Sequence, residues 1–198
     1  MSVQLHQPMT SKPDRLPPIP AREWTPEQKK YAQEIIDGPR GALLSPFVPL
    51  MRSPELMGHA QRMGEYLRYR SALELRLSEL AILVTARYWS QQVEWAIHVP
   101  IALQAGVSSG TIAAIREGRI PTDLPEDEAL VFAFSTELHQ NKCVSDGTWA
   151  RALDLFGERG AVDLVGINGY YALLSMVMNA ARTPMPPSAA SPLPSFPN

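Results

Sequence analysis

The sequence predicts an all-α protein, a compact helix bundle of about seven to eight helices. Three observations support this fold class. Apolar residues recur at helical spacing, as Leu73, Leu77 and Leu80 do. Helix-starting pairs such as Thr25-Pro26 precede several of these runs, and glycine follows them. No run shows the clear alternation of apolar and polar residues that marks a half-buried strand.

The helices follow one another along the first half of the chain. Thr25 caps the first, Gln28 completes a capping box, and Gly38 ends the helix. The pair Ser53-Pro54 starts a second helix, which runs to about residue 69. We expect further helices over residues 73–89, over residues 90–105 with Gly106 as terminator, and a short one after the cap residue Ser108.

The last third of the chain repeats this pattern. We expect one helix from about residue 123 to residue 137, a second from the cap Ser145 to Phe156-Gly157, and a third over residues 158–182. The third contains Asn168-Gly169, a pair typical of hairpins. Because apolar residues surround the pair, we interpret the segment as helix.

Proline gathers near the two ends of the chain. We therefore expect a proline-rich N-terminal arm over residues 1–22, a helical domain over 23–183 and a proline-rich tail over 184–198. The arm would lie over the body or over a partner subunit. For the last residues of the tail, plain disorder is the alternative.

Composition limits the classes of partner and the compartment. The 198 residues carry a net charge of −2, which does not indicate a surface for nucleic acid or for an anionic membrane. The single cysteine, Cys143, excludes an intrachain disulfide. The N-terminus lacks the pattern of a signal peptide, and the most apolar stretch, around residues 162–181, is interrupted by polar side chains. We expect a cytoplasmic protein whose partner is a small-molecule substrate.

One pair of residues stands out as a candidate for catalysis. Glu94 and His98 are four residues apart, so they differ by only about 40° around a helix and share one face. Apolar neighbours favour partial burial, which raises the pKa of a carboxyl group and lowers that of an imidazole, whereas their pairing acts in the opposite direction. Such a coupled pair suits proton transfer near neutral pH. The alternative is a surface pair, or a buried pair that serves packing.

The residues around this pair carry a resemblance to a known family. The run from Glu94 to Ser108 resembles the signature helix of the carboxymuconolactone decarboxylase family, within the alkylhydroperoxidase-like superfamily. Glu79, the run 160–165 and the segment 169–171 also resemble that family. The resemblance spans about residues 45–182. It implies an all-helical fold that forms a homo-oligomer (dimer, trimer or hexamer), with active sites lined by the signature helix.

The sequence departs from the peroxidase branch of that superfamily. Peroxidase members carry Cys-x-x-Cys-x-x-x-His, and aligning His98 with that histidine puts Gln91 and Glu94 at the cysteine positions. Without these thiols there is neither a peroxidatic nor a resolving cysteine, so thiol peroxidase activity is disfavoured. The Glu-x-x-x-His version resembles the decarboxylase branch, which uses no metal and no organic cofactor.

The resemblance assigns roles to several residues. His98 is the expected general acid or base, Glu94 orients it or shuttles a proton, and Glu79 is a possible second relay group. Arg76 or Arg87 would bind a substrate carboxylate, unless these arginines are exposed or held in structural ion pairs. Further candidates for substrate binding are Gln91, Tyr88, Trp95 and Tyr171.

The expected function is therefore that of a cofactor-independent lyase of the carboxy-lyase type. Its substrate would be small and carboxylated or lactone-like, and decarboxylation is favoured. The alternatives are an isomerase, another lyase or a lactone hydrolase on the same pair, or a non-catalytic oligomeric binding protein.

Overall fold

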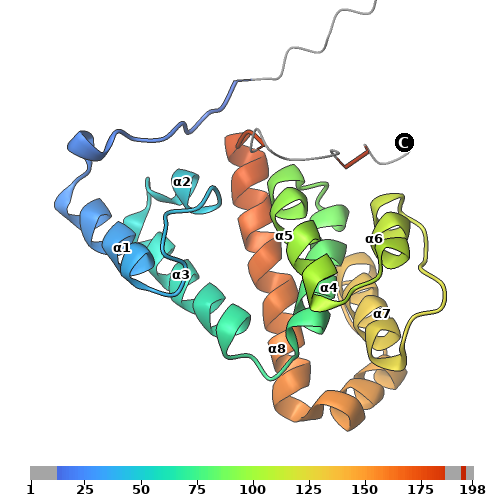
Figure 1. Ribbon diagram of the computed structural model, residues 1–198. Coiled ribbons are helices and arrows are strands. Elements are labelled where there is room, and N and C mark those ends of the chain that lie inside the picture. The colour runs from blue at the N-terminus through green and yellow to red at the C-terminus, as the bar shows by residue number, and fades with distance from the viewer. Residues whose placement is uncertain (1–12, 186–192, 195–198) are drawn as a thin grey trace, which may run out of the picture.

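A computed structural model describes residues 13–185 and 193–194, and within this part of the chain the protein is all-helical, as the sequence predicts (Figure 1). A short 3-10 helix precedes eight α-helices. Their bounds are Ala21–Glu23 for the 3-10 helix and then α1 Pro26–Asp37, α2 Phe47–Leu50, α3 Pro54–Tyr69, α4 Leu75–Tyr88, α5 Gln92–Ala105, α6 Ser109–Arg116, α7 Glu126–Asn141 and α8 Asp146–Ala181.

Most helices begin and end at the residues that the sequence indicates. Thr25 and Gln28 form the predicted capping box, and Gly106 ends α5 with a φ of 103°, in the left-handed region that favours glycine. The two helices predicted on either side of Gly157 are consecutive parts of α8, which breaks there at φ 68° and ψ 173°. The short helix α2 was not predicted from the sequence, and α7 extends past Glu137 to Asn141.

Helix α4 forms the centre of the bundle. It packs against α5, α6, α7 and α8, and every residue from 77 to 87 is buried. A helix that is covered on all sides carries no continuous polar face, so its polar residues must find partners inside the protein. The buried polar side chains of α4, Glu79 among them, therefore lie in contacts between helices.

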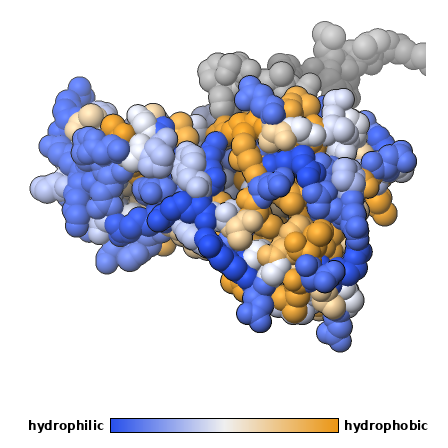
Figure 2. Space-filling view, turned by 60° about the horizontal axis from the view of Figure 1, so that its bottom comes forward, coloured by the Kyte–Doolittle hydropathy of each residue, from blue (hydrophilic) through white to orange (hydrophobic). Residues whose placement is uncertain are grey.

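Helices α1, α2 and α3 project to one side of this bundle (Figure 1). They join it where α2 and α3 contact α8. On the face shown in Figure 2 this projection is mostly hydrophilic, whereas apolar surface gathers over the bundle. Exposed apolar side chains of the bundle include Leu103 of α5 and Val162 and Val165 of α8.

Helix α8 is long and apolar enough, by length and composition alone, to cross a membrane. However, 61% of the apolar 18-residue stretch that meets this test is buried inside the protein. Tyr170, Leu164 and Ile167 are among its buried side chains, and they contribute to the hydrophobic core. We therefore interpret α8 as a core helix.

The described parts of both proline-rich ends lie against the bundle. The backbone N–H of Arg15 donates to the carbonyl of Ala181 at the end of α8 (2.8 Å), and Arg52 donates to the carbonyl oxygens of Leu16 and Pro17. In the tail, the backbone N–H and the carbonyl of Leu193 both pair with the side-chain amide of Gln92. The remaining residues of the predicted arm and tail lie outside the described residues.

A close helix contact fixes α1 on α3. A Cβ atom built on Gly58 would lie 2.3 Å from the ring of Tyr31, so the ring packs directly on the glycine backbone. We expect Gly58→Ala to lower the free energy of unfolding by about 1–3 kcal/mol, because overpacking forces the ring away. Gly147→Ala is the matched control, since a Cβ there meets no atom within 4 Å. Urea denaturation of both variants checks this expectation, and equal stability of the two would contradict it.

Candidate active site

The structure brings Glu79, Glu94 and His98 together between α4 and α5. His98 Nδ1 lies 2.7 Å from Glu79 Oε2, and His98 Nε2 lies 3.3 Å from Glu94 Oε2. Helices α4 and α5 pack side by side, which brings Glu79, the possible second relay group, to His98. The imidazole therefore stands between two carboxylates, with one ring nitrogen facing each.

All three side chains of this cluster are buried, with exposed fractions of 0% for Glu79, 1% for Glu94 and 2% for His98. Burial by itself lowers the pKa of His98. Pairing with the two carboxylates outweighs burial and raises the pKa to about 9. His98 is therefore an imidazolium at neutral pH, with a proton available at each ring nitrogen.

The turn between α4 and α5 sets the register of the cluster. The side chain of Gln91 accepts a hydrogen bond from the backbone N–H of Val93 (2.6 Å) and thereby caps α5. Its amide nitrogen donates to Asn179 of α8 (2.8 Å). Gln91, a predicted substrate-binding residue, thus lies at a helix cap, one turn before Glu94.

A cavity of about 20 Å³ adjoins Glu94 and His98. Such a volume holds about one water molecule. Tyr171, a predicted site residue, lines it and meets the His98 ring edge-on, with ring centroids 5.0 Å apart. Glu79 does not line this cavity, so it contacts His98 from the side of α4. The other lining residues are Arg40, Leu44, Pro46, Phe47, Arg68, Ile97, Tyr170 and Leu174.

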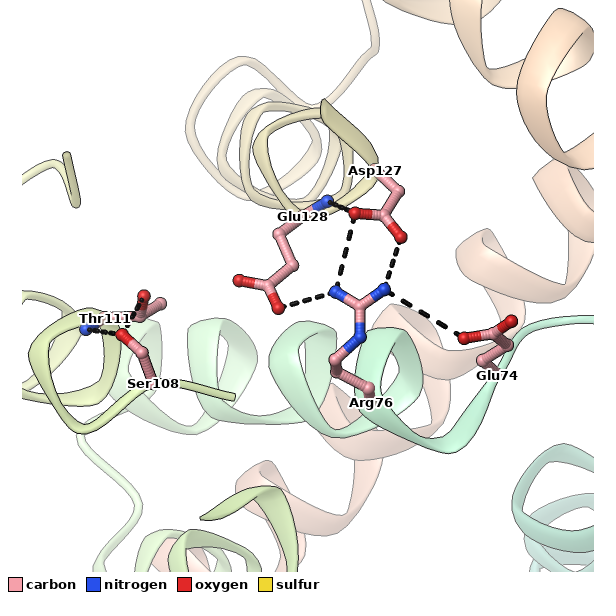
Figure 3. A network of polar contacts seen from close by, with 6 residues as sticks. All are labelled: Glu74, Arg76, Ser108, Thr111, Asp127 and Glu128. Carbon is pink, nitrogen blue, oxygen red and sulfur yellow. Dashed lines mark hydrogen bonds and ion pairs between the residues drawn. The ribbon is translucent and has the colours of Figure 1, made fainter. Parts of the chain in front are cut away.

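Arg76 lies in a different polar network, on the side of α4 that faces α7 (Figure 3). Its guanidinium pairs with Asp127 through both terminal nitrogens and with Glu128 Oε1 at 2.6 Å. Pairing with Arg76 holds the pKa of Asp127 below its ordinary value. The structure therefore gives Arg76 a structural ion pair, the alternative that the sequence left open.

The remaining predicted binding residues lie elsewhere. Arg87 and Tyr88 line a broad apolar groove of about 610 Å³ between α4, α6 and α7. Arg87 also donates to the carbonyl of Pro194 (3.4 Å). Trp95 is 3% exposed and belongs to the hydrophobic core. Of the predicted substrate-binding residues, only Tyr171 lines the small cavity beside His98.

Three polar residues of this cavity did not emerge from the sequence: Arg40, Arg68 and Tyr170. Arg40 lies in the connection between α1 and α2, Arg68 on α3 and Tyr170 on α8. No local spacing joins positions so far apart. The only signal was that Tyr170 precedes Tyr171 in a segment that resembles the family.

A second buried histidine belongs to the core rather than to this site. His139 Nε2 lies 3.0 Å from the hydroxyl of Thr85, which donates either to Asn168 or to the carbonyl of Ala81. Asn168 in turn donates to Ser135. Asn168 is therefore part of a hydrogen-bond network in the core.

The region that holds this site is similar to a known family. Residues 54–137 match the model of the carboxymuconolactone decarboxylase family, a segment that contains Glu79, Glu94 and His98. The resemblance predicted from the sequence is therefore confirmed. No protein with a curated description matches this chain.

A solved structure shows the same fold. It is an alkylhydroperoxidase AhpD core, an uncharacterized peroxidase-related protein from Ralstonia eutropha JMP134. It aligns with a TM-score of 0.73 over 88% of this chain and 93% of its own, at 14% sequence identity. At this identity the likeness establishes the fold alone.

The raised pKa of His98 predicts a pH-dependent stability. Because the folded-state pKa of about 9 exceeds the ordinary value of 6.5, the stabilisation is fully present below pH 6.5 and is lost as the pH rises through 9. We expect the melting temperature of the wild type to fall over this range more steeply than that of His98→Gln. An NMR titration of His98 gives the midpoint directly. A midpoint below 6.5 would show that burial prevails over pairing.

The structural role of Arg76 predicts a loss of stability on its removal. Arg76→Gln leaves Glu128, whose side chain is 4% exposed, without its cation. We expect the free energy of unfolding to fall by about 1–3 kcal/mol. The matched control is Arg62→Gln, whose partner Glu34 is 35% exposed and whose loss should cost no more than about 0.5 kcal/mol. Chemical denaturation compares the two, and an equal loss would refute the role of Arg76.

Proposed function

We propose that this chain, whose core matches the carboxymuconolactone decarboxylase family, is a cofactor-independent carboxy-lyase for a small carboxylated or lactone-type substrate. The observation that carries the proposal is the buried imidazolium of His98 between two carboxylates, next to a cavity. A proton donor of pKa about 9 is charged at neutral pH and is able to protonate a carbanion or an enolate.

The proposed reaction needs only proton transfer from the protein. A carboxylate placed β or vinylogous to a carbonyl loses carbon dioxide when its C–C bond breaks and the electron pair moves towards the carbonyl oxygen. The resulting enolate takes a proton at carbon, and its electron pair forms the new C–H bond. His98 delivers that proton, directly or by way of Glu94, and water returns one to the pair afterwards.

The three members of the cluster divide this work by position. Glu94 and His98 line the cavity, so they are the proposed catalytic residues. Glu79 contacts His98 from the other side, at the Nδ1 atom, and fixes the ring orientation and its charge. Glu79 is therefore a positioning residue in this proposal.

Substrate entry requires the cavity to widen, because about 20 Å³ holds about one water molecule. The wall that includes Arg40, Leu44 and Pro46 comes from the connection between α1 and α2, which has no regular helix. We propose that the part of this connection that holds Leu44 and Pro46 moves outward when the substrate binds, while Arg40 keeps its contacts with Gln61 and Phe47. The other walls are helices packed into the bundle.

Proton transfer is favoured over peroxide chemistry by the placement of the one thiol. Cys143 is exposed in the connection between α7 and α8 and does not line the cavity at His98. An isomerase, another lyase or a lactone hydrolase would use the same acid–base pair.

We further propose a cytoplasmic homo-oligomer, which the exposed apolar residues of α5 and α8 favour.

Replacing either catalytic residue tests the proposed site. We expect His98→Ala and Glu94→Gln to lower turnover by a factor of at least about 10², because each removes a proton-transfer group. Carbon dioxide release from a panel of lactone and keto acids is the measurement. His59→Ala is the control, since His59 is exposed on α3. With circular dichroism confirming the fold, full activity of both site variants would disprove the assignment.

The pH profile tests the roles of His98 and Glu79 together. As the general acid, His98 must be protonated, so we expect kcat to fall as the pH rises through about 9. Glu79→Gln removes one of the carboxylates that raise the pKa of His98, so this descending limb should move to lower pH. A lower kcat with an unchanged limb would mean that Glu79 does not act through His98.

A further inference from the structure

Two polar side chains, Tyr170 and Arg40, line the cavity beside His98. Tyr170 is 1% exposed, and its hydroxyl has the guanidinium of Arg40 as a polar neighbour but meets no hydrogen-bond partner of good geometry among the described residues. The same is true of the buried Nη2 atom of Arg40. A buried polar group without a partner costs about 1–3 kcal/mol, which makes such atoms candidates for ligand binding.

Gly64 on α3 brings these two groups side by side. A Cβ atom built on Gly64 would lie 2.2 Å from Tyr170 Oη and 2.7 Å from Arg40 Nη2. Both polar atoms therefore converge on the space that the absent side chain leaves. Arg40 is held there by Gln61, which accepts from its Nε (3.3 Å), and by the ring of Phe47, 5.0 Å from the guanidinium carbon.

The two arginines that line this cavity are not held in ion pairs with carboxylates of the described residues. In the part of the chain that the structure describes, neither Arg40 nor Arg68 forms an ion pair, although both line the cavity. Two arginines and His98 line this cavity together with one acidic side chain, Glu94. Burial raises the pKa of Tyr170 to about 12, so its hydroxyl stays protonated and is a donor.

We propose that Arg40 and Tyr170, with Arg68 beside them, form a binding subsite for one carboxylate of the substrate. The subsite supplies N–H and O–H donors to that carboxylate, while Glu94 and His98, which line the same cavity, reach the rest of the molecule. The substrate class is a small, oxygenated organic acid that places one carboxylate in this subsite. This inference rests on the proposed function for the direction of the chemistry.

Calorimetric titration with a matched pair of probes tests the subsite. The probes are 5-oxotetrahydrofuran-2-carboxylate and the corresponding primary carboxamide, which differ only in the charge of one group. We expect the wild type to bind the acid at least about tenfold more tightly than the amide. Equal affinities for the two, or no affinity for the acid, overturn the proposal.

Variants locate the site of binding. Arg40→Gln should weaken binding of the acid by about tenfold, and Tyr170→Phe by a smaller factor. Gly64→Ala keeps every charge but puts a methyl group where the two donors meet, so it should weaken binding as well. The control is Arg62→Gln on the same helix as Gly64, whose arginine pairs with Glu34 away from the cavity. With melting temperatures confirming the fold, wild-type affinity in Arg40→Gln overturns the proposal.

One further variant separates this inference from the proposed function. Glu94→Gln should lose turnover but still bind the acid more tightly than the amide. If no substrate releases carbon dioxide while binding still depends on Arg40, the subsite stands and the proposed reaction fails. If carbon dioxide is released and Arg40→Gln changes neither KM nor binding, the reaction stands and the subsite fails.

Discussion

The burial of two carboxylates and one imidazole between α4 and α5 is the constraint on which the site depends. Each of these charges would be costly alone in the protein interior, and each is tolerated because the others stand beside it. The two helices must therefore keep the register that puts His98 between Glu79 and Glu94. Several other features serve that register, including the cap at Gln91 and the edge-on contact of Tyr171 with the His98 ring.

Helix α4 serves two ionic groups within one turn. Arg76 reaches Asp127 and Glu128 of α7, whereas Glu79, three residues later, reaches His98 of α5. The first group ties two helices together at the border of the bundle, where partial exposure limits the cost of desolvation. The second is fully enclosed, so its energy depends on protonation. One helix thus carries, three residues apart, an arginine paired with α7 and a glutamate paired with α5.

The helices and part of the site were predictable because their signals are local. Capping residues, glycine terminators and the spacing of Glu94 and His98 act within a turn or two of chain. The partners of Arg76 lie more than fifty residues away, and Arg40, Arg68 and Tyr170 come from three separate segments. Their convergence depends on how α3 and α8 pack, down to the missing side chain at Gly64, and no periodicity in the sequence records it.

The cap at Gln91 makes it harder to replace this residue by the cysteine of the peroxidase pattern. In the peroxidase pattern a cysteine stands at this position, yet here the side-chain oxygen of Gln91 holds the first turn of α5 and its nitrogen ties that turn to Asn179. A thiol is a poor substitute for either bond. A variant of this chain that acquired the peroxidase pattern would need a new start for α5 as well as a second cysteine at Glu94. Exchange between the two sequence patterns therefore requires several coupled substitutions, because one of them removes the cap that starts a helix.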